Sequence, residues 1–166
     1  MEPPFKPEEI LRILENHRVD FVVVGGFAAI MHGSPENTND IDIAPEQSRE
    51  NLERLSAALD ELNARVRTEK VEGGMPFSHS GESLAGVTVL NMVTDLGALD
   101  ITSVPAGTHG YRDLSRDATT MIIGGTQADI ASLADVIRSK EAANRDRDRA
   151  SLPTLRKILE EKSGES

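Results

Sequence analysis

Phe21-Val22-Val23-Val24-Gly25-Gly26, followed after a short segment by Asp40-Ile41-Asp42-Ile43, is the stretch that decides the fold. The apolar run before the glycines predicts a buried strand. Successive side chains of a strand point to opposite faces, so Asp40 and Asp42 share one face and the two isoleucines share the other. Two carboxylates side by side repel each other unless a cation lies between them. Oxygen ligands of this kind suit Mg²⁺.

The glycine pair Gly25-Gly26 separates this strand from a short helix that we expect over Phe27 to His32. Backbone N–H groups at the positive end of a helix can bind phosphate. Metal-binding carboxylates beside a phosphate site are the minimum set for phosphoryl or nucleotidyl transfer. A Gly-Gly pair alone often marks only a tight turn, and an Asp-x-Asp alone often lies on a solvated strand edge. The two together, in this order, are more specific.

Composition favours one globular domain of mainly aliphatic core, since the 166 residues are 38% hydrophobic and 28% charged, without Trp and with one Tyr. We expect a single domain over 1–166, with a core at about 7–130 and a helical part at about 131–162. The absence of cysteine excludes disulfides, thiolate zinc sites and cysteine catalysis. Neither a membrane-length apolar run nor a signal-peptide pattern is present, so we expect a cytoplasmic protein.

The net charge of −10 argues against a general nucleic-acid binder, because such proteins usually carry a basic surface. The charge is nevertheless uneven along the chain. Five basic residues gather near the C-terminus, and they are Arg138, Lys140, Arg145, Arg147 and Arg149. This segment could contact phosphates, or it could be a solvated helix surface with ion pairs.

The remaining pattern predicts an α/β or α+β fold, a small mixed sheet backed by helices and followed by two C-terminal helices. A polar segment at 68–85 is expected to be a mobile loop or a poorly packed insertion, and the tail from Lys162 is expected to fray. The expected helices begin at Pro7, at Phe27, at Pro45, after a Ser132 cap and near 151–153. The expected strands cover 20–24, 39–44, 87–93, 98–104 and a Gly124-Gly125 hairpin of 120–123 with 126–130.

Two segments together carry a family resemblance. The first runs from Val24-Gly25-Gly26-Phe27-Ala28 through His32-Gly33 to Thr38-Asn39-Asp40-Ile41-Asp42-Ile43, and it resembles the signature of the DNA polymerase β-type nucleotidyltransferase superfamily. The second runs from Leu133 through Lys140 to Arg145, Asp148 and Leu152-Pro153, and it resembles the helical motif of the AbiEii and MenT toxin nucleotidyltransferases. The resemblance spans about 20–156 and implies the nucleotidyltransferase fold.

The superfamily resemblance implies three metal-binding carboxylates that hold two Mg²⁺ ions. Asp40 and Asp42 match the first two, and Asp100 in Leu99-Asp100-Ile101 matches the third. Asp100 could also act as the base for an acceptor hydroxyl. The alternative for Asp100 is a strand-edge carboxylate bonded to backbone. Asp95 is the rival third ligand, although its place in a turn with Gly97 favours a structural role.

The same resemblance implies a nucleoside triphosphate site. Gly25 and Gly26 would let backbone amides approach the phosphates, while Lys140 and Arg145 would neutralise them. Asp148 would orient Lys140 or Arg145, or it is simply an acid in the first turn of a helix.

Two residues depart from the superfamily pattern. Phe27 stands where many members carry a phosphate-binding serine, so that contact is missing or comes from Ser34 or Thr38. Glu36 stands where relatives often carry a basic residue, which would weaken phosphate binding. His32 could touch a phosphate, but a histidine before a helix-ending glycine more often serves the helix end.

The sequence thus predicts a Mg²⁺-dependent nucleotidyltransferase that moves a nucleoside monophosphate from an NTP to an acceptor hydroxyl. The toxin resemblance suggests tRNA 3′ ends as acceptor and a cognate antitoxin as partner. A small molecule such as a cationic antibiotic is the alternative that the acidic charge suits, and a protein hydroxyl is another. A non-catalytic nucleotide-binding or interaction module of the same fold is the rival of a different class. A third possibility is a homodimer that builds its acceptor pocket across the interface, so both a monomer and a homodimer stay open.

Overall fold

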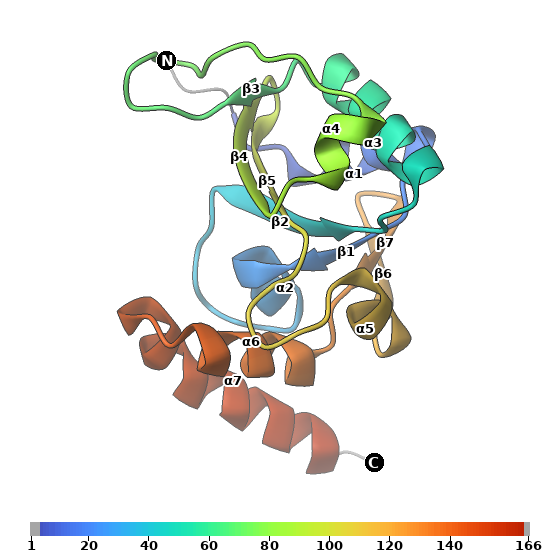
Figure 1. The fold of residues 1–166 in the computed structure, drawn as a ribbon. Helices are drawn as coiled ribbons and strands as arrows, with labels where there is room; N and C mark the ends of the chain where they lie inside the picture. The colour runs from blue at the N-terminus through green and yellow to red at the C-terminus, as the bar shows by residue number, and fades with distance from the viewer. Residues whose placement is uncertain (1–3, 165–166) are drawn as a thin grey trace.

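A mixed sheet forms the centre of the molecule, and Figure 1 shows it edge-on between two sets of helices. The structure is a computed structural model that describes residues 4–164. Within that range the seven strands lie in the order β3-β4-β5-β2-β1-β7-β6. Their bounds are β1 (Phe21–Val24), β2 (Asp40–Pro45), β3 (Arg65–Val66), β4 (Val89–Thr94), β5 (Gly97–Thr102), β6 (Thr119–Ile123) and β7 (Thr126–Ile130).

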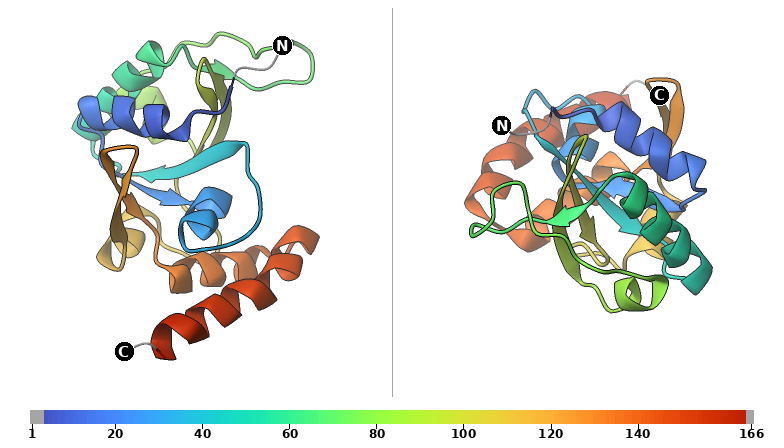
Figure 2. Two further views of the ribbon diagram at one scale, coloured as in Figure 1. Left: turned by 180° about the vertical axis from the view of Figure 1, so that it is seen from behind. Right: turned by 90° about the horizontal axis from the view of Figure 1, so that it is seen from above.

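Helices cover both faces of the sheet (Figures 1 and 2). One face carries α1 (Pro7–Asn16), α3 (Arg49–Glu61) and α4 (Gly81–Ala85). The other carries α2 (Gly25–Met31), α5 (Tyr111–Arg116) and α6 (Leu133–Ala143), and α7 (Asp146–Gly164) packs against α6 as an outer layer. The expected class, a mixed sheet backed by helices with two helices at the C-terminus, is confirmed.

The core is aliphatic, as the composition predicts. Ile41 and Ile43 of β2 have no exposed surface, because alternation along the strand turns them away from the face that carries the aspartates. On α3 the expected leucine stripe of Leu52, Leu55 and Leu59 is buried. Within residues 4–164 none of the helices is long and apolar enough to cross a membrane.

The hairpin of β6 and β7 follows the sequence prediction closely. Gly124 and Gly125 connect the strands with φ of +59° and +85°, values that glycine adopts without steric cost. The helix after Ser132 is confirmed as well, since the Ser132 hydroxyl accepts a hydrogen bond from the Asp135 N–H at 3.0 Å.

Two helix starts differ from the prediction. Pro45 does not open α3, because it is the last residue of β2 and pairs with Phe21 of β1. The helix begins only after Ser48, whose side chain caps it by accepting a hydrogen bond from Asn51 N–H. The helix α2 begins at Gly25 instead of Phe27, so the glycine pair forms its first turn.

The last helix also begins earlier than predicted, at Asp146 instead of near 151–153. Asn144 ends α6 in the left-handed conformation with φ of 51°, and the chain enters α7 directly afterwards. Pro153 therefore lies inside α7. The helix continues through Lys162 to Gly164, so fraying from Lys162 is wrong as far as the structure describes the chain.

The segment 68–85 is more ordered than a mobile loop. Val66 of β3 forms a bridge with Met75, with backbone hydrogen bonds in both directions. The helix α4 begins after Ser80, which forms a reciprocal capping box with Ser83. The sequence prediction missed α4, β3 and α5, which are all short.

Candidate metal and nucleotide site

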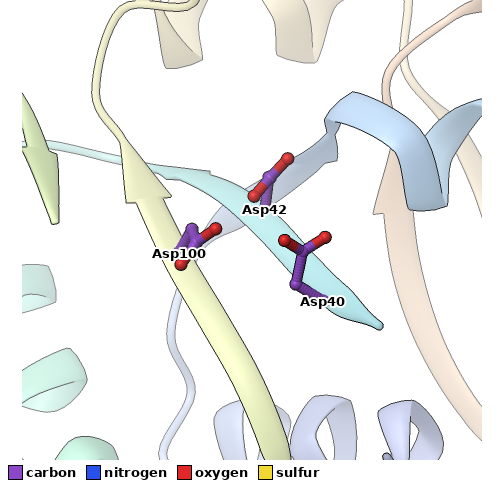
Figure 3. Close-up of side chains that lie close together, drawn as sticks. All are labelled: Asp40, Asp42 and Asp100. Atoms are coloured by element: carbon purple, nitrogen blue, oxygen red, sulfur yellow. The ribbon is translucent and has the colours of Figure 1, made fainter. Parts of the chain in front are cut away.

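Asp40, Asp42 and Asp100 converge on one point, as Figure 3 shows. The first two come from β2 and the third from β5, the neighbouring parallel strand. The register places Asp42 directly beside Asp100, which is why residues so far apart in sequence meet. One oxygen of each carboxylate lies within 4.8 Å of the others. The predicted convergence of the three side chains is confirmed.

A glycine is required where α2 meets this cluster. A Cβ built on Gly25 would lie 2.1 Å from Oδ2 of Asp42, and Gly25 has φ of +70°. Any side chain there would displace the carboxylate and strain the backbone. At Gly26 a Cβ would meet only Thr38, with Oγ1 at 3.7 Å. The first glycine of the pair therefore makes room for Asp42.

Hydrogen bonds hold the carboxylates of Asp40 and Asp100 in place. The hydroxyl of Thr38 donates to Oδ1 of Asp40 at 2.9 Å. The guanidinium of Arg67 donates to Oδ1 of Asp100 at 2.8 Å, and the N–H of Met92 donates to the same oxygen at 3.3 Å. Sequence reasoning missed Arg67, because it comes near Asp100 only through the order of the strands.

Burial and mutual repulsion perturb the cluster. Burial raises the pKa of Asp42, and the charges of Asp40 and Asp100 raise it further. Burial also raises the pKa of Asp100, with the charge of Arg67 acting in the opposite direction. A buried set of carboxylates that disfavours its own ionisation is stabilised by a cation.

The donor set fits a hard divalent cation. All three groups are carboxylates, the ligands that Mg²⁺ and Mn²⁺ prefer. Oxygens on one Mg²⁺ at about 2.1 Å lie at most about 4.2 Å apart, so a small side-chain rotation brings the cluster to binding distance. The rival ligand Asp95 instead forms an ion pair with Arg65 at 3.1 Å, in the turn where a structural role was expected.

The cluster opens into a cleft of about 620 Å³ between the sheet, α2 and the two C-terminal helices. Three basic side chains, those of Lys140, Arg145 and Arg147, line it together with the aspartates. The charge of Arg147 favours the ionised form of Asp42. Arg147 was predicted only as one of five basic residues near the C-terminus, and the structure singles it out together with Lys140 and Arg145.

Asp148 organises two of these cations. It is fully buried, with Oδ1 at 3.6 Å from Nζ of Lys140 and Oδ2 accepting from Nε of Arg145 at 2.7 Å. Its Oδ2 also accepts the Arg145 N–H at 3.1 Å, at the start of α7. Burial acts to raise the pKa of Asp148, but the bonds from Arg145 and the charges of Arg145 and Lys140 outweigh it and hold the pKa low. Asp148 thus makes the contacts that both hypotheses require, those that orient Lys140 and Arg145 and those of an acid in the first turn of a helix.

Not every predicted residue faces the cleft. Thr38 and Glu36 line it, but Ser34 does not. Ser34 is buried, and its hydroxyl accepts the Glu36 N–H at 3.3 Å within the turn. Of the two hydroxyls considered as a replacement for the missing serine, only that of Thr38 lies at the cleft, and its proton is donated to Oδ1 of Asp40. Phe27 itself is a core residue, and its ring packs edge-on against Phe5.

His32 serves the packing of helices. Its Nε2 lies 2.7 Å from the Ala131 carbonyl oxygen, and its Nδ1 lies 3.2 Å from Nζ of Lys162 on α7. Burial lowers the pKa of His32, so the ring stays neutral. The structure thus assigns His32 to packing at the end of α2 and not to the cleft.

Comparison with solved structures identifies the architecture. The lincosamide antibiotic adenylyltransferase LnuA, with lincomycin bound, matches with a TM-score of 0.61 at 12% identity, over 95% of this chain and 99% of that one. A candidate nucleotidyltransferase from Thermotoga maritima matches with a TM-score of 0.54 at 20% identity, over 96% and 97%. The antibiotic-resistance factor ANT(2'')-Ia matches with a TM-score of 0.57 at 16% identity, over 91% and 80%.

The fold is that of the nucleotidyltransferases. At these identities the likeness extends to the fold alone. No protein-family model matches this sequence, and no curated protein matches it either. The narrower resemblance to the AbiEii and MenT toxins stays a prediction from the sequence motifs.

Proposed function

We propose that this protein is a metal-dependent nucleotidyltransferase that moves a nucleoside monophosphate from an NTP to an acceptor hydroxyl. The observation that carries the proposal is the cluster of Asp40, Asp42 and Asp100 at a cleft whose opposite wall carries basic side chains. Carboxylates alone would repel a triphosphate, and basic residues alone would not bind a metal. Their presence in one cleft suits a metal–triphosphate pair.

The roles follow from position. Bound Mg²⁺ would stabilise the charge on the transferring phosphate and on the leaving pyrophosphate. Asp40, Asp42 and Asp100 would hold it, and Asp100 would accept the proton of the acceptor hydroxyl as that oxygen attacks the α-phosphorus. Lys140 and Arg145, both held by Asp148, would bind the triphosphate.

The phosphate side of the cleft completes the proposed nucleotide site. Gly25 and Gly26 line the cleft, and Gly26, whose missing side chain leaves open space, would let phosphate oxygens approach the backbone, whereas the space at Gly25 holds Asp42. Thr38 also lines the cleft, but its hydroxyl proton is donated to Asp40, so we assign it to holding that carboxylate and not to the phosphates. Arg147 joins the proposed set as a third cation. Ser34 drops out of it, because it is buried and does not line the cleft.

Two acceptor classes have support. A small-molecule hydroxyl, as on an antibiotic, is favoured by the fold neighbours that act on or bind such compounds, LnuA with lincomycin and ANT(2'')-Ia with adenylyl-tobramycin. The net charge of −10 suits a cationic acceptor of that kind. A tRNA 3′ end, with the protein acting as the toxin of a toxin–antitoxin pair, is favoured by the motif from Leu133 to Leu152.

A transfer assay tests the proposal and separates the acceptors. The purified protein is incubated with each α-³²P-labelled NTP and Mg²⁺, with total tRNA, an aminoglycoside or a lincosamide. We expect label on one acceptor class, lost in Asp42→Ala and retained in Asp95→Ala, whose carboxylate lies in the outer turn. Labelled tRNA would support the toxin role and labelled drug the resistance role.

Absence of transfer to any acceptor, including the protein itself, together with no pyrophosphate exchange, would contradict the proposal. It would favour a non-catalytic module of the same fold, for which Phe27 and Glu36 are the sequence support.

A further inference from the structure

Arg67 carries a charged side chain beside the carboxylate cluster, and the proposed nucleotidyl transfer gives it no role. It follows β3 directly, and its backbone N–H donates to the Asn91 carbonyl oxygen of β4 at 2.9 Å. From there its side chain reaches Asp100 on β5, and the ion pair is 2.8 Å long. The side chain of Arg67 is 46% exposed and that of Asp100 only 11%. Arg67 therefore covers Asp100 from the outer edge of the sheet.

The two carboxylate oxygens of Asp100 differ in the hydrogen bonds that they accept. Oδ1 accepts from both Arg67 and the Met92 N–H, at 2.8 and 3.3 Å. A carboxylate oxygen that accepts two hydrogen bonds has little remaining capacity for a cation. The other oxygen of Asp100 is thus the one available to the cluster. Arg67 is absent from the residues that line the cleft, so it contacts Asp100 from outside the cleft.

The charge balance points the same way. When a bound cation keeps all three carboxylates ionised they carry a charge of −3, and the guanidinium of Arg67 reduces the total to −2. A positive group in direct contact with a metal ligand makes the potential at the site less negative and so weakens its attraction for a cation. Removal of Arg67 would therefore strengthen cation binding even as it frees Asp100 to rotate.

We propose that Arg67 is a positioning residue that restricts Asp100 to one free oxygen, leaving that oxygen for the metal and for the proton of the acceptor. Without Arg67, Asp100 would engage a cation with both oxygens and would lose the orientation needed to accept a proton. The second half of this inference rests on the proposed nucleotidyl transfer. The first half, the effect on cation binding, does not.

The test compares Arg67→Met with Arg65→Met. Arg65 lies two residues earlier, and it bonds the carbonyl oxygens of Gly73 and Asn63 and the carboxylate of Asp95, without contacting Asp100. Mn²⁺ binding to each protein without nucleotide is measured by electron paramagnetic resonance, and kcat and KM for the NTP are measured with the acceptor that the transfer assay identifies.

For Arg67→Met we expect Mn²⁺ to bind several-fold more tightly while kcat falls by about 10–100-fold. The KM for NTP should stay within about two-fold, because Arg67 does not line the cleft. Arg67→Lys keeps the charge and should recover most of kcat, and Arg65→Met should leave all three values near those of the unaltered protein.

Weaker or unchanged Mn²⁺ binding in Arg67→Met would overturn the inference, because a residue that merely supports the sheet edge would weaken the site. An unchanged kcat would overturn it as well. If the unaltered protein transfers no nucleotide at all, the proposed function fails, yet the Mn²⁺ titration still decides how Arg67 acts on Asp100.

Discussion

Gly25 matters to the site because it lacks a side chain. Its missing Cβ leaves the space in which Oδ2 of Asp42 lies, and its φ of +70° would strain any L-residue. The same glycine thus allows α2 to begin directly at the end of β1 and allows the carboxylate to approach the helix. A Gly-Gly pair in the sequence indicates a tight turn. Only the structure shows that the first glycine makes room for a carboxylate and the second does not.

Replacement of Gly25 and of Gly26 by alanine should affect metal binding differently. In Gly25→Ala the new methyl group would lie 2.1 Å from Oδ2 of Asp42, so the carboxylate must move and Mn²⁺ binding should be lost. In Gly26→Ala the methyl group meets only Thr38 at 3.7 Å, so Mn²⁺ binding should persist. Isothermal titration with Mn²⁺ checks both, and equal loss in the two variants would show that the space beside Asp42 is not the deciding factor.

The stability of the metal-free protein should depend on pH through Asp42. Burial, followed by the charges of Asp40 and Asp100, raises its pKa to about 8 from the usual 3.8. The folded state therefore binds more protons than the unfolded state between these values, and stability is greatest below about pH 4 for this group and falls as pH rises towards 8. Other titrating groups also change the pH dependence of stability in this range. The contribution of Asp42 is therefore measured as the difference between the unaltered protein and Asp42→Asn.

We expect the Tm difference between Asp42→Asn and the unaltered protein to grow in favour of the variant from pH 5 to pH 8. The growth should reach at least the roughly 2–4 °C that 1 kcal/mol corresponds to in a chain of this size. Saturating Mg²⁺ should abolish the difference or reverse it, since only the unaltered site gains from the cation. A Tm difference that stays constant with pH would contradict the raised pKa.

Individual site residues were predictable where their chemistry was local. Asp40 and Asp42 stand out because apolar neighbours on a strand make carboxylates costly, and Asp100 shares that environment. Arg67 gave no such signal, since an arginine at the end of a short edge strand is ordinary. Its contact with Asp100 depends on the sheet order β3-β4-β5, which a single sequence does not state.

At the scale of elements, the start of α7 links stability to the proposed nucleotide site. Asp148 lies in its first turn and holds Arg145 and Lys140 from the preceding segment and helix. Its pKa is lowered overall, so its stabilising contribution is present above the usual value of 3.8 and is lost on acidification below it. The junction of α6 and α7 therefore fixes two cations that face the cleft.

Asp148→Asn should weaken both functions of this junction. Loss of the hydrogen bonds that the buried Asp148 carboxylate accepts from Arg145 should cost about 1–3 kcal/mol, and the KM for NTP should rise because Lys140 and Arg145 lose their anchor. Asp146→Asn is the matched control, since Asp146 lies in the same turn with its side chain 98% exposed and should change stability by less than about 0.5 kcal/mol. Urea unfolding and NTP kinetics check both, and similar effects of the two variants would contradict the anchoring role.

Elements were predictable where turn and cap signals were unambiguous. The Gly124-Gly125 hairpin and the Ser132 cap are examples, because each signal acts within a few residues. Proline misled the prediction twice. Pro45 ends a strand, where it pairs with Phe21 of β1, and Pro153 lies exposed within α7, which already begins at Asp146.

At the scale of the whole molecule, the layered fold gathers the site from four separate parts of the chain. The sheet order places β5 beside β2, and residues of α6 and α7, the helices that lie below the sheet in Figure 1, line the same cleft. Neighbours of 12–20% identity share this fold. The fold class was predictable from the sequence. The identity of the acceptor was not, because it depends on the side chains of the cleft wall, and they form no sequence pattern that identifies a ligand.

A crystal of the protein grown with Mn²⁺ and a nonhydrolysable NTP analogue tests the central claim most directly. The anomalous signal of manganese should lie between Asp40, Asp42 and Asp100, with the triphosphate extending towards Lys140 and Arg145. Manganese bound elsewhere, or a nucleotide outside this cleft while the three carboxylates stay free of metal, would contradict the account.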